Sequence, residues 1–250
     1  MPYTTRSGLR IHYRLRGEGE PLVLIHGWSA SGWTNFDGFG WTDYLAGRYR
    51  VLLPDMRGHG RSAKPWRAGA YTFEGMAADV VAAMDDAGIE RALVFGYSTG
   101  AQVAVQLLLD HPERVRAAAL GGIGARFHFG WGRRFAVEDG LRRRLIDWFP
   151  PRRLPDLARW LLNDPVALGV CFRSLYKGDE VVDLGRLGEI QAPVLVVNGT
   201  RDRFTRSAEE LVAAIPGARL ALVSGRNHAS ALGDRRLKAA VGGFFGSVSE

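Results

Sequence analysis

The chain has 250 residues, 46% of them hydrophobic, which suits one large domain, or one domain with an insertion, around a sizeable core. No apolar run reaches the roughly 18 residues of a membrane helix, so we expect no membrane partner. The net charge is +7 and 30 of the 33 basic residues are arginine, but these are scattered and interleaved with acids, which disfavours nucleic acid as a partner.

Apolar runs and helical periodicity alternate along most of the chain. Residues 10–17 alternate in polarity like a half-buried antiparallel strand, and the later strands are continuous apolar runs. Strands are expected at 10–17, 21–27, 50–62, 92–96, 115–124, 192–200 and 218–225. Helices are expected at 73–87, 99–111 and 235–245. This alternation predicts a mostly parallel α/β sheet that helices cover on both faces.

The alternation stops between residues 125 and 187, where the sequence has no strand-like run. This segment is rich in aromatic residues and contains Pro150, Pro151 and Pro155. It is too long for a structureless loop in a compact domain. We therefore predict a helical cap at 125–187, inserted between two parts of one α/β core at 1–124 and 188–250.

Cysteine content and the first residues of the chain bear on the compartment. Cys171 is the single cysteine, so an internal disulfide is impossible. The first 17 residues lack the apolar segment of a signal peptide. Both observations predict a cytoplasmic protein. The sequence has neither zinc-type His/Cys spacing nor a phosphate-binding G-x-G-x-x-G, so we expect no metal and no cofactor.

A lone serine lies between two glycines in the run "ALVFGYSTGAQVAVQL", residues 92–107. Gly96-Tyr97-Ser98-Thr99-Gly100 has the pattern G-x-S-x-G, in which a tight strand-to-helix turn exposes a nucleophilic hydroxyl. The pattern alone is weak, because an ordinary turn also contains glycine and serine. Its position between a predicted strand and a predicted helix favours Ser98 as a nucleophile.

A nucleophilic serine needs a base and an acid that orients the base. His228 follows the last predicted strand, and Asp202 follows the strand before it. Taken singly, Asp202 is equally a turn residue and His228 a surface histidine. Together, the order Ser98, Asp202, His228 at three strand ends predicts a catalytic triad.

Two backbone N–H groups are predicted to stabilise an oxyanion. Thr99 begins the helix after Ser98, where N–H groups lack intrahelical acceptors and the helix dipole favours negative charge. Trp28 follows "IHG" at the end of an earlier strand and is the second candidate. The side chains of Trp28, Trp33 and Tyr97 are predicted to line the substrate pocket, although Trp28 is equally compatible with a core position.

These stretches resemble the α/β-hydrolase family, in particular its capped, esterase-like branch. The matching segments are "LIHGW", "LPDMRGHGRS", "GYSTGA", "VVNGTRD" and "GRNHA". The resemblance implies an eight-stranded, mostly parallel, doubly wound sheet with a cap. It assigns Ser98, Asp202 and His228 the triad roles, and Trp28 and Thr99 the oxyanion positions. It implies a structural role for Asp55, Arg57 and His59, so His26 and His59 are not counted as catalytic. Many relatives have Met-Gly-Gly after the serine, where this chain has Thr99-Gly100-Ala101. Many also have Gly-x-Gly before the histidine, where this chain has Gly225-Arg226-Asn227.

The predicted reaction is hydrolysis of a small to medium apolar or aromatic carboxylic ester through an acyl-enzyme. Serine at position 98 disfavours the dehalogenase and epoxide hydrolase branches, which use aspartate there. Carbon–carbon bond hydrolysis, cofactor-free perhydrolysis and thioester hydrolysis use the same triad and stay open as alternatives. A non-catalytic protein that binds a ligand beneath the cap is a further alternative. The sequence leaves the oligomeric state and the natural substrate open.

Overall fold

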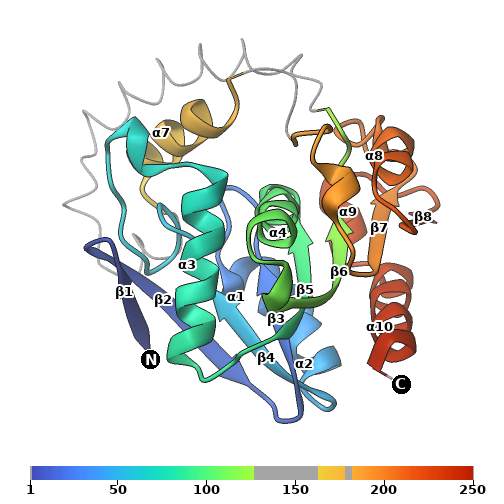
Figure 1. The fold of residues 1–250 in the computed structure, drawn as a ribbon, viewed down its shortest axis with the longest axis horizontal. Coiled ribbons are helices and arrows are strands. Elements are labelled where there is room, and N and C mark those ends of the chain that lie inside the picture. The colour runs from blue at the N-terminus through green and yellow to red at the C-terminus, as the bar shows by residue number, and fades with distance from the viewer. Residues whose placement is uncertain (1, 127–162, 178–181, 250) are drawn as a thin grey trace.

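The computed structural model describes residues 2–126, 163–177 and 182–249 of the chain. Its central feature is a sheet of eight strands (Figure 1). The strands are β1 (Tyr3–Arg6), β2 (Leu9–Arg16), β3 (Glu20–Ile25), β4 (Tyr49–Pro54), β5 (Ala92–Tyr97), β6 (Val115–Gly121), β7 (Val194–Gly199) and β8 (Arg219–Val223).

The strand order is β1-β2-β4-β3-β5-β6-β7-β8. β1 pairs antiparallel with β2, and β2 pairs antiparallel with β4. All later pairings are parallel, including Ile25 of β3 with Gly96 of β5 and Gly121 of β6 with Val197 of β7. Because parallel strands end at one edge of a sheet, the loops after β3, β5, β7 and β8 meet there.

Helices cover both faces of the sheet, and each face has its own apolar core. One face packs against α3 (Phe73–Asp86), α4 (Thr99–Asp110) and α8 (Ala208–Ala214), and Figure 1 shows α3 and α4 in front of the strands. The other face packs against α2 (Trp41–Leu45) and α10 (Arg235–Ser249). The other helices among the described residues are α1 (Gly32–Asn35), α7 (Pro165–Leu175) and α9 (His228–Leu232). Short 3-10 turns there are η1 (Asp37–Phe39), η2 (Ala68–Ala70), η3 (Pro112–Arg114) and η5 (Leu187–Glu189).

This architecture confirms the predicted doubly wound, mostly parallel sheet of eight strands. The seven expected strands are present with shifts at their ends; the run 50–62, which was expected to end in an acidic, Gly-rich loop, forms a strand over Tyr49–Pro54. β1 and the short helices α1, α2, α8 and α9 were not predicted individually. No helix of the described parts of the chain is long and apolar enough to cross a membrane.

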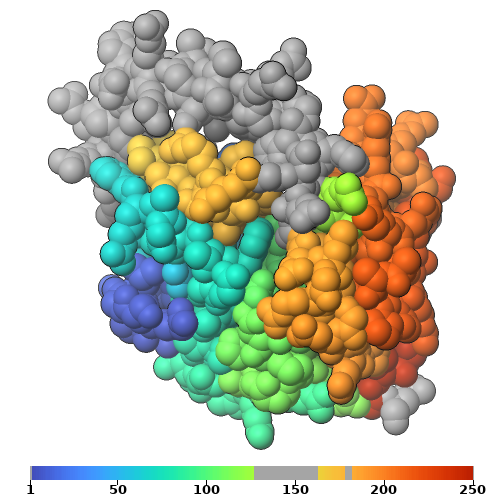
Figure 2. All heavy atoms as spheres, turned by 45° about the horizontal axis from the view of Figure 1, so that its top comes forward, coloured from blue at the N-terminus to red at the C-terminus, as the bar shows by residue number. Residues whose placement is uncertain are grey.

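Helix α7 belongs to the segment predicted as a cap. Asp164 caps its start by accepting hydrogen bonds from the Val166 and Ala167 N–H groups, and Pro165 occupies the first turn, where its missing N–H costs nothing. In Figure 2 the gold atoms of α7 lie against the cyan segment around η2. Cys171 of α7 is fully buried there, beside Tyr71. Most of the predicted cap, including the arginine-rich stretch 132–155, lies outside the described residues.

The loop after β4 is held by a buried carboxylate. Asp55 Oδ1 accepts a hydrogen bond from the Gly32 N–H at 2.9 Å. Its Oδ2 accepts from the Arg61 N–H at 3.0 Å and from His12 Nδ1 at 2.9 Å. The Asp55 side chain thereby joins three separate segments of the chain, which fits the structural role that the resemblance implied for this motif.

The next residues of this loop extend the network toward α3. Arg57 makes two hydrogen bonds of 2.6 Å to Asp79, which saturate the carboxylate in the fork geometry that guanidinium favours. The His59 ring is fully buried and packs edge-on against His26, with 5.2 Å between centroids. His26 Nε2 accepts the Met56 N–H, so His26 Nδ1 carries the proton and donates to the Gly27 carbonyl.

The free energy of unfolding is expected to fall as the pH drops below about 6.5. Burial lowers the pKa of His59 from 6.5 to about 3, and burial also lowers the pKa of His26. Burial alone would raise the pKa of Asp55, but the hydrogen bond from His12 and those from backbone N–H groups hold it at about 2. Each lowered pKa means that the unfolded chain binds protons more readily than the folded chain.

The stability from His59 is therefore lost between pH 6.5 and about 3, that from His26 is lost as the pH falls below 6.5, and that from Asp55 is lost between 3.8 and about 2. Urea unfolding at a series of pH values measures this decline, on the order of a few kcal/mol by pH 4. His59→Asn keeps an N–H donor for the Arg57 carbonyl without a titrating group, so its stability is expected to vary less with pH. An unchanged slope between pH 6.5 and 4 in that variant contradicts the assignment to His59.

Candidate active site

Ser98 occupies the sharp turn between β5 and α4. Its backbone has φ 56° and ψ −120°, a conformation that residues other than glycine rarely adopt. Its N–H donates to the Gly121 carbonyl at 2.7 Å, which fixes the turn to the neighbouring strand β6. A Cβ on Gly96 would collide with the Gly100 backbone, and a Cβ on Gly100 would collide with the Ile25 carbonyl. The two glycines therefore let strand and helix approach closely enough to project Ser98 from the turn.

The structure brings Ser98, His228 and Asp202 together from three strand ends. His228 Nε2 lies 3.0 Å from Ser98 Oγ, and His228 Nδ1 lies 2.7 Å from Asp202 Oδ2. A carboxylate only accepts hydrogen bonds, so it places the imidazole proton on Nδ1. Nε2 is then left with the lone pair that a proton from Ser98 requires.

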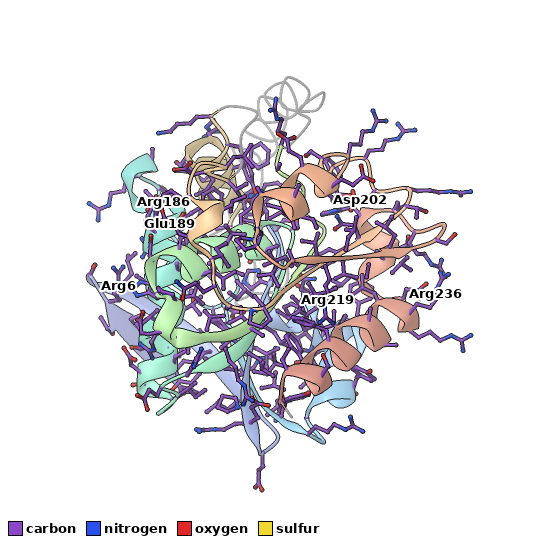
Figure 3. The ribbon with its side chains drawn as sticks, turned by 45° about the vertical axis from the view of Figure 1, so that its right-hand side comes forward. Arg6, Arg186, Glu189, Asp202, Arg219 and Arg236 are labelled. Carbon is purple, nitrogen blue, oxygen red and sulfur yellow. The ribbon has the colours of Figure 1, made fainter. Side chains whose placement is uncertain are left out.

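Asp202 and His228 differ in their exposure to solvent, and this difference suits their pairing. The Asp202 side chain is fully buried, and Oδ1 accepts a hydrogen bond from the Phe204 N–H at 3.0 Å. Asp202 belongs to the loop after β7, toward the upper right in Figure 3. The His228 side chain is 24% exposed, so the imidazole remains accessible while its partner is shielded from water.

Two aromatic rings hold the imidazole in place. Phe204 contacts the His228 ring edge-on with 5.0 Å between centroids, and the Tyr97 ring lies 5.4 Å from it. The Tyr97 hydroxyl donates to the His228 carbonyl at 2.6 Å. Tyr97 was expected in the substrate pocket, but its side chain is buried in the core below His228, next to Phe95. As successive strand residues alternate between faces, Tyr97 shares the face of Phe95.

The two expected oxyanion residues belong to segments next to Ser98. Thr99 is the first residue of α4, so its N–H is one of the donors that the helix itself does not satisfy. Trp28 follows Gly27, and a Cβ on Gly27 would stand 3.3 Å from Ser98 Cβ, which places this loop against the serine. Trp33, the third expected pocket residue, lies in α1 and is 40% exposed.

The structure also shows residues near this site that the sequence did not single out. Tyr176 follows α7, and its hydroxyl lies 2.7 Å from Thr99 Oγ1. The Asn163 side chain accepts a hydrogen bond from the Gly60 N–H at 2.6 Å and donates to the Ser29 carbonyl at 2.9 Å. Asn163 has φ 60°, a conformation that asparagine tolerates better than most residues.

The described residues also bear on whether side chains here could hold a metal ion. Within residues 2–126, 163–177 and 182–249, no group of three or more His, Cys, Asp and Glu side chains is arranged to hold a metal ion. The hydrogen bonds of Asp202, His228 and Ser98 join an acid, a base and a hydroxyl in series. Such a series can move one proton from the serine while the serine attacks an electrophile.

Known proteins are similar to this chain in sequence and in fold. A family model of the alpha/beta hydrolase fold matches residues 20–164. A 2-hydroxy-6-oxononadienedioate/2-hydroxy-6-oxononatrienedioate hydrolase of Cupriavidus pinatubonensis is 31% identical over 88% of this chain and 84% of its own length. The dihydrolipoyllysine-residue acetyltransferase component of the acetoin cleaving system of Cupriavidus necator is 33% identical over 90% of this chain, which spans 63% of that protein. The solved structure of Est816, an N-acyl homoserine lactone degrading enzyme, superposes with a TM-score of 0.74 at 29% identity, covering 97% of this chain and all of the other.

Proposed function

The chain belongs to the α/β-hydrolase fold family, and from this premise we propose that it is a serine hydrolase of small to medium apolar or aromatic carboxylic esters. The observation that carries the proposal is the continuous series of hydrogen bonds from Ser98 through His228 to Asp202, with distances of 3.0 and 2.7 Å. A buried carboxylate, an oriented imidazole and a hydroxyl on a strained turn are the parts that acyl transfer requires.

The reaction proceeds in two halves. In the first, His228 Nε2 takes the Ser98 proton while Ser98 Oγ attacks the ester carbonyl carbon, and the alcohol leaves with the proton from His228. In the second, His228 takes a proton from water, the hydroxide attacks the acyl-enzyme, and Ser98 regains its proton as the acid leaves. Asp202 keeps the imidazole in the required tautomer and stabilises the imidazolium in both halves.

The backbone N–H groups of Trp28 and Thr99 supply the oxyanion contacts in this proposal. Each tetrahedral intermediate carries its negative charge on the former carbonyl oxygen. One such donor commonly contributes about 3 to 4 kcal/mol to stabilising the transition state. The dipole of α4, which begins at Thr99, adds a favourable partial charge at the same place.

The aromatic character of the nearby side chains supports an apolar acyl or alcohol group. The Trp28 ring lies 5.1 Å from the ring of Phe172, and Phe172 lies 4.9 Å from Tyr176. This row of rings begins at Trp28 and ends at Tyr176, whose hydroxyl contacts Thr99, so it offers apolar surface beside the two proposed oxyanion residues. The similar enzyme Est816 degrades N-acyl homoserine lactones, and a lactone is a cyclic ester open to the same attack.

A series of p-nitrophenyl esters with acyl chains of increasing length tests the proposal. Release of p-nitrophenol is expected, with an optimum chain length that reports the size of the acyl site. Treatment with a fluorophosphonate is expected to add one phosphonyl group, which peptide mass spectrometry should locate on Ser98. An absence of turnover with every ester, or labelling elsewhere, contradicts the proposal.

Carbon–carbon bond hydrolysis is the second candidate, and the 31% identical relative from Cupriavidus pinatubonensis favours it. That protein is named as a hydrolase of 2-hydroxy-6-oxo dienedioates, which contain a ketone and no ester, so that hydrolysis of their carbon skeleton has to break a carbon–carbon bond. A synthetic 2-hydroxy-6-oxo-dienoate, followed by the loss of its visible absorbance, tests this candidate beside the esters. Turnover of the dienoate without turnover of any ester would replace the esterase proposal.

A further inference from the structure

Helix α7 and the residue after it contact both residues that were assigned to the oxyanion site. The Trp28 indole Nε1–H donates to the Leu168 carbonyl of α7 at 3.1 Å, and its ring packs on Phe172. The Tyr176 hydroxyl lies 2.7 Å from Thr99 Oγ1. Helix α7 with Tyr176 thus contacts the loop after β3 and the first residue of α4.

The Tyr176 hydroxyl bridges the first turn of α4. It donates to Gln102 Oε1 at 2.6 Å, and its single proton is thereby used. The contact of 2.7 Å with Thr99 must then be a bond that Thr99 Oγ1–H donates to the Tyr176 oxygen. Burial raises the pKa of Tyr176 above its usual value, so the hydroxyl keeps this proton at neutral pH.

The bridge lies at the first turn of α4, where backbone N–H groups have no acceptors within the helix. Thr99 and Gln102 are three residues apart, so their side chains lie on the same side of the helix. Both are buried. The Thr99 N–H has no acceptor within the helix, and its direction depends on the geometry of this first turn. Since threonine has few allowed χ1 rotamers, fixing its hydroxyl also restrains its backbone.

We propose that Tyr176 is a positioning residue that orients the Thr99 N–H toward the oxyanion by clamping Thr99 and Gln102. The proposal rests on the serine-hydrolase function put forward above. Because α7 also holds Trp28, the position of this helix sets the spacing between the two oxyanion donors. In this proposal α7 affects the rate of the chemical step through the position of the oxyanion donors, and this effect does not require α7 to contact the substrate.

Tyr176→Phe removes the bridging hydroxyl and keeps the ring. We expect kcat for a p-nitrophenyl ester to fall by about 10- to 100-fold, because a displaced oxyanion donor weakens transition-state binding. KM is expected to stay within about twofold, since the donor acts mainly after attack. The Ki of a trifluoromethyl ketone, whose adduct with Ser98 carries an oxyanion, is expected to rise by the factor by which kcat/KM falls.

Tyr71→Phe is the matched control. Tyr71 is also buried, packs beside Cys171 of α7, and donates its hydroxyl to the Pro65 carbonyl at 2.7 Å. Its removal measures the general effect of deleting a buried tyrosine hydroxyl next to α7. We expect Tyr71→Phe to lower the melting temperature while kcat and the ketone Ki remain unchanged.

Thr99→Val breaks the bridge from its other end and serves if Tyr176→Phe does not fold. It keeps the backbone N–H and the side-chain shape but removes the hydroxyl that contacts Tyr176, so we expect it to lower kcat by a similar factor.

The double variant is expected to be no slower than the slower single variant, because both changes break one bridge. If the unaltered chain hydrolyses esters through Ser98 but Tyr176→Phe matches Tyr71→Phe in kcat, the positioning role is overturned. If the unaltered chain hydrolyses no ester, the proposed function itself fails, and the two results are distinguishable.

Discussion

Replacing Ser98 with alanine is expected to lower kcat for ester hydrolysis by about 10⁶-fold, or about 8 kcal/mol in activation free energy. The substitution removes only Oγ, the atom that lies 3.0 Å from His228 Nε2. Without this atom no acyl-enzyme forms, and the residual rate comes from the oxyanion contacts and substrate binding alone. Stopped-flow or long-time release of p-nitrophenol, combined with the loss of phosphonate labelling, measures the effect.

Ser29→Ala provides the matched control for this variant. Ser29 also has a positive φ, 62°, and lies in the loop after β3 on the same edge of the sheet, but its side chain is exposed. Ser29→Ala makes the same chemical change at a residue with positive φ and leaves the triad intact. Its kcat is expected to stay within about twofold of the parent. A Ser98→Ala protein that retains more than about a hundredth of the parent kcat contradicts the assignment of the nucleophile.

Asp202→Asn is expected to lower kcat by about 10⁴-fold while the fold stays intact. The Phe204 N–H holds Oδ1 in place, so the new amide nitrogen takes the position of Oδ2 beside His228. An amide N–H at this position needs an acceptor, which moves the imidazole proton from Nδ1 to Nε2. Nε2 then has no lone pair for the Ser98 proton. Kinetics at neutral pH measure the loss, and NMR of the imidazole N–H reports the tautomer.

Asp234→Asn is the corresponding control. Asp234 is a buried carboxylate paired with Arg226 and Arg236, close in the chain to His228 but without a bond to its ring. Its loss is expected to lower the melting temperature and to leave kcat within about twofold of the parent. Equal losses of kcat in both variants mean that Asp202 acts through local folding rather than through the tautomer of His228.

The sequence predicts the sheet well because its central strands are buried on both faces and read as continuous apolar runs. The edge strand β1, by contrast, has the sequence Tyr-Thr-Thr-Arg and is partly exposed, so it lacks such a run. The helices α1 and α2 have four and five residues, too few for a helical period to be recognised. A contact with a distant part of the chain stabilises α2: the Trp41 indole donates to the Leu232 carbonyl, 191 positions away.

The candidate site likewise contains residues that the sequence predicts and a contact that it does not predict. Motif and chain order are sufficient to select Ser98, Asp202 and His228, because the fold fixes where strand ends meet. The face of the sheet that Tyr97 occupies follows from its spacing to Phe95, and this signal was available. The contact of Tyr176 with Thr99 spans 77 residues and depends on how α7 sits over the core, which no local pattern encodes.

The burial of Cys171 gives the molecule a useful chemical property. It is the single cysteine of the chain, it is fully buried beside Tyr71, and burial raises the pKa of its thiol to about 12. The thiolate that maleimides and disulfide reagents attack is therefore almost absent at neutral pH. A cysteine introduced at the surface becomes the one reactive thiol of the folded protein. Spin labels or fluorophores attached singly, without prior removal of a native cysteine, can then follow α7 relative to the sheet during turnover.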